Sequence, residues 1–374
     1  MNNNKNGASG SGGIILYAKQ SGCTSFKSLF TIKHAVGTNK VGHTGTLDSF
    51  AEGLLVVCTG CLTRLSGIIT GFDKEYDAVI KFGEETDTLE PNGQITATAD
   101  LPEFSAFEAA VNKIKGEQLQ TPPSFSAIHV NGKRASDMVR SGEAVQIPPR
   151  KITVYEASVK EVQTVDVEDK KCVKYAHITF SVSKGTYIRS LARDIALSCG
   201  SRATLIGLRR TKVGSLSLED AAGASLLPVF GISSVLAGLE KREEASEMVG
   251  LTADNAKPSG NAAAFIVASR AKNAEAESRL KEEILNKKLS FSPELAVECG
   301  LCVLRLKAGY DKAFFNGQPL KLSFFEEDAG WSGSESSETC KYAVFAETDS
   351  FAGVIERSGN RFRYDFVVSG ADRQ

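Results

Sequence analysis

The sequence lacks an apolar run of the roughly 18 residues that a membrane-spanning helix needs. It also lacks the apolar segment of a signal peptide, because residues 1–12, MNNNKNGASGSG, are polar and of low complexity. These two absences argue against a membrane protein and against a secreted one. We therefore expect a cytoplasmic protein that begins with a disordered tail over residues 1–12.

An excess of positive charge is also missing. The chain carries 44 Lys and Arg residues against 45 Asp and Glu residues, a formal net charge of -1. This balance argues against a uniformly basic nucleic-acid-binding protein. The distribution is uneven, however, since residues 184–212 hold seven basic residues and one acid, whereas residues 73–108 hold ten acids and two lysines. The basic stretch fits a phosphate backbone or an ordinary solvated helix face, and charge alone leaves both open.

Closely clustered cysteines are missing as well. Two CxxC pairs, Cys58 with Cys61 and Cys299 with Cys302, could together supply four zinc ligands. The pairs lie far apart in sequence, and each lies in an apolar segment where a free cysteine packs as a small apolar side chain. We therefore interpret these cysteines as core residues and predict no metal site.

The 374 residues suggest two or three domains. Residues 13–222 mix strand and helix patterns, including a helix that ends at Gly37, a helix over residues 61–72 and a strand over residues 76–83. This mixture predicts an α+β domain. The Ala-, Glu- and Lys-rich residues 223–288 predict a linker or helical insertion, and short strand patterns over residues 289–374 predict a small β-rich domain.

A single carboxylate, Asp48, lies in the Gly- and Thr-rich stretch VGHTGTLD over residues 41–48. An aspartate in such a stretch often binds its own backbone in a turn. The alternative is a catalytic carboxylate presented from a loop. The residue types alone do not decide between these two interpretations.

The stretch GHTGTLD resembles the active-site motif of the TruB family of tRNA pseudouridine synthases. Further blocks resemble the same family in the same order over residues 13–222: GIILYAKQSGCTS, Lys74–Tyr76, Thr86–Thr88, PPSFSAIHVNGKR, SKGTYIRSLARDIA and LRRTKVGSLSLEDA. The resemblance implies a pseudouridine synthase core, in which helices flank a mixed sheet, followed by a PUA-like domain over residues 289–374. It also implies that the protein isomerises uridine 55 in the T-loop of tRNA, with the T-arm stem-loop as partner and no cofactor, membrane or obligatory protein partner.

The resemblance assigns the catalytic roles to Asp48, Tyr76 and Arg189. Asp48 would act at the ribose, by attack on C1′ or by removal of the C2′ proton, as a carboxylate does in glycoside hydrolysis. Arg189 would hold that carboxylate in two places and keep it ionised. Tyr76 would stack on the uracil. Without the family, Arg189 would be a surface helix arginine and Tyr76 a packing residue.

The resemblance also implies a set of substrate contacts. His43 would contact the T-loop near the vacated base, and Leu208 would form an apolar wall beside the uracil. The remaining predicted contacts are Gly42 and Thr44 in the motif, and Lys184, Arg193, Arg209, Arg210 and Lys212 for phosphate. Ser49, Gln20, His129 and Ser136 depart from the family pattern, which puts some RNA contacts in doubt but leaves the three catalytic residues.

Two other functions compete with this one. A related enzyme of the dyskerin type would modify rRNA within a guide-RNA particle, but the chain has no long lysine-rich tail. An RNA-binding chaperone would refold tRNA without chemistry, and this role is compatible with catalysis because the target uridine must be flipped out of its loop. Mapping pseudouridine in a treated tRNA transcript separates these alternatives.

Overall fold

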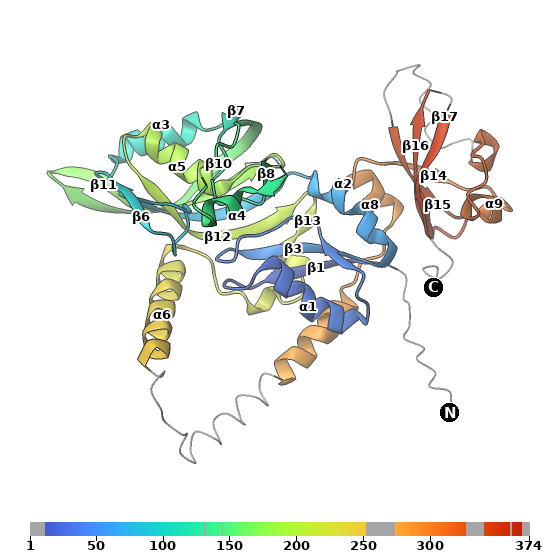
Figure 1. The fold of residues 1–374 in the computed structure, drawn as a ribbon, viewed down its shortest axis with the longest axis horizontal. Helices are drawn as coiled ribbons and strands as arrows, with labels where there is room; N and C mark the ends of the chain where they lie inside the picture. The colour runs from blue at the N-terminus through green and yellow to red at the C-terminus, as the bar shows by residue number, and fades with distance from the viewer. Residues whose placement is uncertain are drawn as a thin grey trace, which may run out of the picture.

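The computed structural model describes residues 12–130, 132–143, 145–251, 274–326, 340–359 and 361–368. The predicted tail lies outside these residues except for Gly12, and so does the middle of the predicted linker. Figure 1 shows the arrangement of the described elements.

A nine-stranded sheet forms the centre of the molecule. Along its main path the strand order is β1-β3-β12-β4-β11-β10-β7, while β2 pairs with β3 and β13 with β12. The contact between β3 and β12 is parallel and β4 pairs with its neighbours antiparallel, so the sheet is mixed. The strands are β1 (Ile14–Lys19), β2 (Val41–His43), β3 (Glu52–Thr59), β4 (Lys74–Phe82), β7 (Gly116–Gln120), β10 (Arg150–Val167), β11 (Lys170–Val182), β12 (Ala203–Val213) and β13 (Leu216–Ser217).

Two short hairpins accompany this sheet. One joins β5 (Glu84–Thr86) to β6 (Ile95–Thr98), and the other joins β8 (His129–Val130) to β9 (Lys133–Arg134). Gly132, at the turn of the second hairpin, has a φ of 81°, in the left-handed region that glycine tolerates. The Asn-Gly pattern at this turn therefore folds as a hairpin, as it does in many proteins.

Helices cover both faces of the sheet. They are α1 (Ser25–Val36), α2 (Ser66–Thr70), α3 (Phe104–Lys113), α4 (Ala135–Arg140), α5 (Ile188–Ser198) and α6 (Ile232–Leu251), with 3-10 helices η1 (Gly60–Leu65), η2 (Leu218–Asp220) and η3 (Ala224–Leu226). In the view of Figure 1, α3 and α5 lie above the sheet and α1 and α6 below it. The helix predicted to stop at Gly37 does so, because Gly37 takes the left-handed conformation with a φ of 69°.

The helix predicted over residues 61–72 is wrong in part. The chain forms the 3-10 helix η1 and then the five-residue helix α2. Thr63 Oγ1 donates to Gly60 O at 2.9 Å, and Ser66 Oγ donates to Thr63 O at 2.7 Å. Hydroxyl groups that bind nearby carbonyl oxygens compete with α-helical bonding, which explains the tighter turns.

The main core lies between the sheet and the helices α3 and α5. Tyr76, Ala78, Ile80 and Phe82 alternate along β4 and are all buried in it. The strand periodicity expected for residues 76–83 is therefore confirmed. Phe107 of α3 packs edge-on against Phe82, with ring centroids 5.6 Å apart.

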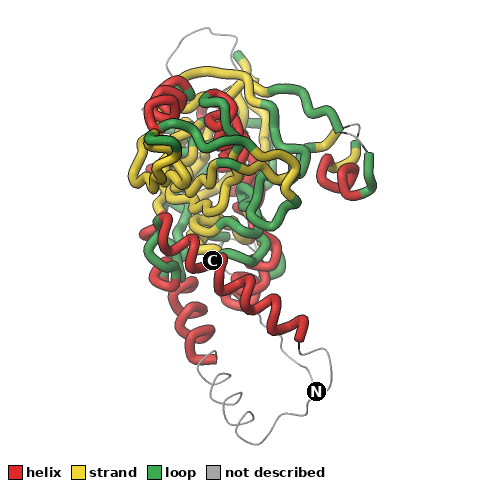
Figure 2. Tube along the Cα trace, turned by 90° about the vertical axis from the view of Figure 1, so that its left-hand side faces the viewer, coloured by secondary structure: helices red, strands yellow, loops and turns green. Residues whose placement is uncertain are grey.

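The described parts of residues 223–288 are packed helices. Ile232 at the start of α6 is buried with Val79 and Ile206 of the sheet. A second helix, over residues 274–286, buries Ile284 against α1 and β1. Figure 2 shows these two helices extending from the same end of the molecule. Residues 223–288 were predicted to be a linker or a helical insertion. The contacts of these two helices favour the insertion.

The C-terminal residues form a separate four-stranded sheet. Its order is β14 (Cys302–Arg305), β15 (Cys340–Phe345), β16 (Phe351–Ser358) and β17 (Arg361–Val367), with α8 (Pro293–Glu298), α9 (Asp311–Phe315) and the 3-10 helix η4 (Leu322–Phe324) beside it. Part of this unit shares one apolar cluster with the central sheet, since Phe345 and Val354 are buried together with Ile14 and Leu54.

Three of the four CxxC cysteines lie in that shared cluster. Cys58, Cys61 and Cys299 are buried there, whereas Cys302 is exposed. Burial raises the pKa of both Cys58 and Cys299 to about 12, so these thiols stay protonated. Buried protonated thiols fit the interpretation as core residues.

Candidate active site

The loop that carries Asp48 joins β2 to β3 and is fixed by the start of α1. Ser25 Oγ accepts from Leu47 N at 2.9 Å and lies 3.0 Å from Leu47 O. Lys19, which is fully buried, donates from Nζ to Ala51 O at 2.5 Å. Burial lowers the pKa of Lys19 to about 8. Sequence reasoning gave Lys19 no role, although a lysine that ends an apolar strand was a visible signal.

Asp48 and Arg189 form the centre of the site. Arg189 Nη2 donates to Asp48 Oδ1 at 3.2 Å, and Arg189 Nε lies 3.0 Å from Oδ2. The arginine side chain is 3% exposed, whereas that of the aspartate is 31% exposed. The guanidinium therefore grips the carboxylate in two places and leaves part of it open. The structure brings these two predicted residues together, and the contact is not the turn-type bond that a loop aspartate often makes.

Two further chain segments, residues 88–90 and the stretch around Phe125, meet at the same guanidinium. Arg189 Nη1 donates to Thr88 O at 3.0 Å, and Nη2 donates to Phe125 O at 3.1 Å. Arg189 Nη1 also lies 2.8 Å from Glu90 Oε1. The guanidinium of Arg189 thus contacts three segments that are distant in sequence. This hub fixes the position of Asp48 relative to α5.

Glu90 is a member of the site that sequence reasoning missed. Burial raises the pKa of its carboxyl group to about 7; Arg189 opposes the rise, and the negative charge of Asp48 adds to it. The two carboxylates therefore share one guanidinium, and Glu90 titrates close to neutral pH. The signal for it was present, because Glu90 lies in the acid-rich residues 73–108 and just after Thr86–Thr88.

Tyr76 lies in the apolar wall beside the Asp48 loop. It is 9% exposed and belongs to the same buried cluster as Leu47, Phe50 and Leu208. Its cross-strand neighbours are Phe180 on β11 and Arg210 on β12. The structure thus places Tyr76 and Leu208 together, next to the residues that flank Asp48.

His43 lies at the end of β2, opposite Val57. Burial lowers its pKa, and the positive charge of Arg210 lowers it further, so the imidazole is neutral at neutral pH. Its Nδ1 atom is buried and has no hydrogen-bond partner within the described chain. This ring can therefore accept or donate a bond to a bound molecule.

The motif residues Gly42 and Thr44 build the loop. Gly42 pairs with Cys58 across the β2–β3 ladder. Thr44 is 2% exposed, and its Oγ1 donates to Val56 O at 3.3 Å. The predicted contact of the Thr44 side chain with substrate is therefore wrong, because that hydroxyl group is buried and already bonded.

Two of the predicted phosphate contacts, Arg209 and Arg210, are already bonded within the protein. Arg210 is 2% exposed, and it donates from Nε to Leu54 O at 2.8 Å and from Nη2 to Gly45 O at 3.1 Å. Arg209 is paired with Glu52 at 2.5 Å and donates to Pro228 O at 2.6 Å. Both guanidinium groups brace the chain around the Asp48 loop. Charge counted along the sequence does not show which side chains the fold buries.

The other basic residues differ in their exposure. Lys184 is exposed. Lys212 lies 3.4 Å from Glu75, but its side chain remains 50% exposed. Arg193 is 19% exposed, pairs with Asp194 at 2.8 Å and donates to Thr121 O at 3.1 Å. Lys184 and Lys212 are therefore the members of the basic stretch that a phosphate can reach most readily.

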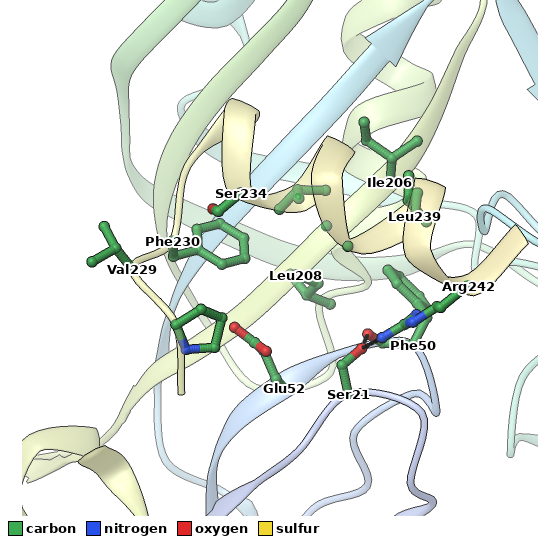
Figure 3. A pocket seen from close by; sticks show the side chains of 14 residues that line it. Ser21, Phe50, Glu52, Ile206, Leu208, Val229, Phe230, Ser234, Leu239 and Arg242 are labelled. Carbon is green, nitrogen blue, oxygen red and sulfur yellow. Dashed lines mark hydrogen bonds between the residues drawn. The ribbon is translucent and has the colours of Figure 1, made fainter. Parts of the chain in front are cut away.

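A cavity of about 130 Å³ lies behind the Asp48 loop, between the loop and α6. Figure 3 shows Arg242 of α6 pointing toward Ser21, with Phe50 and Glu52 beneath it. Arg242 Nη2 donates to Ser21 Oγ at 2.7 Å, and Ser21 Oγ in turn donates to Phe50 O. Phe230 closes another side, where the guanidinium of Arg209 lies 5.0 Å from its ring centre. Thus α6 supports the loop from the rear.

The geometry suits chemistry at an electrophilic carbon. Asp48 is held next to the buried guanidinium of Arg189. It is partly open, and it adjoins an apolar wall that carries a tyrosine. A carboxylate held in this way can act as a nucleophile or as a general base.

Comparison with known proteins agrees with this geometry. The model of the N-terminal domain of TruB family pseudouridylate synthases matches residues 33–188. A tRNA pseudouridine synthase B from Treponema denticola is 38% identical over 372 residues, covering 95% of this chain and 98% of that protein. One from Treponema pallidum is 34% identical and covers 95% of this chain and 96% of that protein.

Solved structures support the fold. A chain in a crystal structure of a Cbf5–Nop10–Gar1 complex superposes with a TM-score of 0.58 at 20% identity, covering 96% of this chain and 86% of that one. The expected fold class is confirmed: helices flank a mixed sheet, and the C-terminal β-rich sheet is consistent with a PUA-like domain. Together with the full-length similarity to the treponemal proteins, these matches show that the chain belongs to the TruB family of pseudouridine synthases.

Proposed function

We propose that this protein converts uridine 55, in the T-loop of tRNA, to pseudouridine. The observation that carries the proposal is the Asp48 carboxylate, gripped by the buried Arg189 and left partly open. The relatives that it matches over nearly their whole length are tRNA pseudouridine synthases B. We assign catalysis to residues 13–222 and the PUA-like unit to residues 289–374, and we place the activity in the cytoplasm.

In this proposal Asp48 acts at the ribose of the target uridine. The glycosidic bond between C1′ and N1 breaks, the uracil turns, and its C5 forms a bond to the same C1′. C5 then loses its proton, with the Tyr76 hydroxyl placed to help, and N1 gains one, so the product is an isomer of the substrate. Asp48 attacks C1′ or removes the proton from C2′ as positive character develops on the sugar. Arg189 holds the carboxylate in place when the substrate displaces water. The reaction transfers no electrons and no group to another molecule, so it requires no cofactor.

The neighbouring residues hold the base and the loop. Tyr76 stacks on the uracil, and Leu208 supports it within the apolar wall. The neutral His43 fills the place that the flipped base leaves in the RNA loop. Lys184 and Lys212 contact phosphate, and these contacts offset the cost of flipping, which is roughly a few kcal/mol.

The test is to incubate the purified protein with a tRNA transcript, without any guide RNA, and to map pseudouridine along it. We expect a single product at position 55, and none when that uridine is replaced by cytidine. Asp48→Asn should reduce the rate by about 10⁴-fold or more while tRNA binding remains. A matched control is Asp137→Asn, which changes an exposed aspartate of α4.

Three outcomes would contradict the proposal. Product at another position would change the assigned uridine. Tight tRNA binding without product would favour the chaperone function. Modification that required an added guide RNA would favour an enzyme of the dyskerin type.

None of the described helices is both long and apolar enough to cross a membrane.

A further inference from the structure

The outward face of α1 exposes two aromatic rings. Phe26 is 74% exposed and Phe30 is 67% exposed, and they lie one helical turn apart. The opposite face of the helix is buried through Leu29, Ile32 and Ala35, which pack against Ile284 of the second insertion helix. The exposed rings thus lie on the side of α1 that the described chain leaves uncovered. Two large neighbouring apolar groups in such a position mark an interaction surface.

The same face is basic. The helix contains Lys27, Lys33 and His34 and has no acidic residue. Lys33 Nζ lies 5.9 Å from the centre of the Phe26 ring, and the Phe30 and His34 rings are 4.1 Å apart. We call Phe26, Lys27, Phe30, Lys33 and His34 the α1 outer face. The neighbouring residues 274–288 do not cancel its charge, because they contain four acidic and four basic residues.

Both ends of α1 lead to the active site. Ser25, the residue before Phe26, is bonded to the backbone of Leu47, which directly precedes Asp48. At the other end, residues 37–40 connect α1 to β2, which ends at His43. An RNA bound at Asp48 therefore lies close to the first turn of α1.

We infer that the α1 outer face binds tRNA outside the T-arm stem-loop, by stacking bases or riboses on Phe26 and Phe30 and by contacting phosphate through Lys27 and Lys33. The inference rests on the proposed function. Aromatic rings interleaved with lysines form the surface that binds nucleic acid without base-specific bonds. A protein partner fits less well, because lysine is depleted at protein–protein interfaces. Arg210 is buried and Arg209 is paired with Glu52, so neither guanidinium is free for the phosphate contact predicted for it.

The first test compares two RNAs with the Phe26→Ser, Phe30→Ser double variant. Both rings are mostly exposed, so the fold should tolerate the change. We expect the Kd for whole tRNA to rise about tenfold or more. The Kd for an isolated T-arm stem-loop, and the single-turnover rate at saturating RNA, should stay at wild-type values. The matched control is Val229→Ser, because Val229 is 88% exposed on the segment before α6.

A substitution series separates stacking from apolar docking. Phe26→Trp with Phe30→Trp should keep the affinity for whole tRNA, because tryptophan stacks at least as well. Phe26→Leu with Phe30→Leu should lose it, although leucine is equally apolar. If the leucine variant bound tRNA like the wild type, stacking on these rings would be excluded.

A photo-crosslinker in place of Phe30 identifies the occupant directly. We expect a crosslink to tRNA nucleotides outside the T-arm. A crosslink to a second copy of the chain, or unchanged tRNA affinity in the serine variant, would overturn the inference. Failure of the wild-type protein to modify tRNA would instead overturn the proposed function. The two failures are therefore distinguishable.

Discussion

Arg189 is the residue on which the site depends most, because a single guanidinium serves Asp48, Glu90 and two backbone carbonyls. A lysine at this position keeps one positive charge but presents it from a single atom. It cannot hold a carboxylate in two places and bind Thr88 O and Phe125 O at the same time.

We therefore predict that Arg189→Lys lowers the single-turnover rate on tRNA by at least 100-fold, an order-of-magnitude expectation for a displaced catalytic group. Circular dichroism and a thermal unfolding curve check that the fold remains. The control is Arg193→Lys, on the same helix but without contact to Asp48. A rate for Arg189→Lys within a few-fold of wild type would show that the two-point grip is dispensable.

Glu90 gives the site a pH dependence whose sign follows from its burial. Its folded-state pKa is raised to about 7 from an ordinary value of 4.5. Between these values the folded protein holds a proton that the unfolded chain has released. The resulting contribution to the free energy of unfolding is fully present below pH 4.5 and is lost as the pH rises through 7.

We predict that Glu90→Gln removes this dependence. Urea unfolding at pH 5.5 and pH 8 should show a larger loss of stability with rising pH in the wild type than in the variant. The comparison between the two proteins cancels the titration of all other groups. Equal losses in both would mean that Glu90 stays ionised across this range, held by Arg189 alone.

The sequence motifs named the candidate residues of the site, but they did not reveal the charged residues that hold the surrounding chain in place. Asp48 and Arg189 are in contact, and Tyr76 and Leu208 are buried in one apolar cluster. The burial of Arg210 could not be predicted, because alternate residues of a strand point to opposite faces and both faces of β12 are covered. Lys19 and Glu90 were missed because a charged group is assigned to the surface unless its partner is known.

At the scale of the elements, α6 packs behind the loop that carries Asp48. It makes this contact through side chains such as Arg242, not through backbone hydrogen bonds. Gly207 of β12 lies so close to it that an added Cβ would stand 2.6 Å from Val235. This approach requires a glycine on the strand. By contrast, Gly238 of α6 lines the cavity, and a Cβ there would meet no atom within 4 Å.

We predict that Gly238→Ala stabilises the protein by about 1 kcal/mol, because alanine favours a helix over glycine by that amount. Phe230→Ala should destabilise it by about 2 kcal/mol, since it enlarges the cavity and removes the ring beside Arg209. Urea unfolding at neutral pH measures the change in the free energy of unfolding for each of the two variants. If Gly238→Ala were destabilising, α6 would not lie in the described position.

The accuracy of the element predictions depended on local signals. The end of α1 followed from the left-handed Gly37, and its start lies at Thr24, whose side chain accepts from Lys27 N. The alternation along β4 followed from Tyr76, Ala78, Ile80 and Phe82 on one face, although Val79 on the other face is buried too. The helix predicted over residues 61–72 was wrong in part, because hydroxyl groups of this segment bind the carbonyl oxygens that a regular α-helix would use. The docking of α6 on the sheet depends on contacts between distant residues, which no local pattern contains.

At the scale of the whole molecule, the net charge of -1 conceals exposed lysines near the site. We predict that the affinity for tRNA falls steeply with salt, because each phosphate contact releases a counterion. Lys184→Gln and Lys212→Gln should each lower the slope of log K against log salt by about 0.7–0.9. Lys115→Gln, an exposed lysine after α3, is the control and should leave the slope unchanged. Affinity independent of salt would indicate recognition by shape and stacking alone.

The cluster shared by the two sheets has a consequence for synthesis on the ribosome. Ile14 of β1 is buried in one cluster with Phe345 and forms a bridge to Leu289. At roughly 5–20 residues per second, translation takes about 15 s to a minute to reach Leu289 after Ile14 has been made. For that interval the part of the β1 and β3 face that packs against residues after 289 has no permanent cover in the nascent chain. We expect this exposed face to be where a chaperone binds the growing polypeptide.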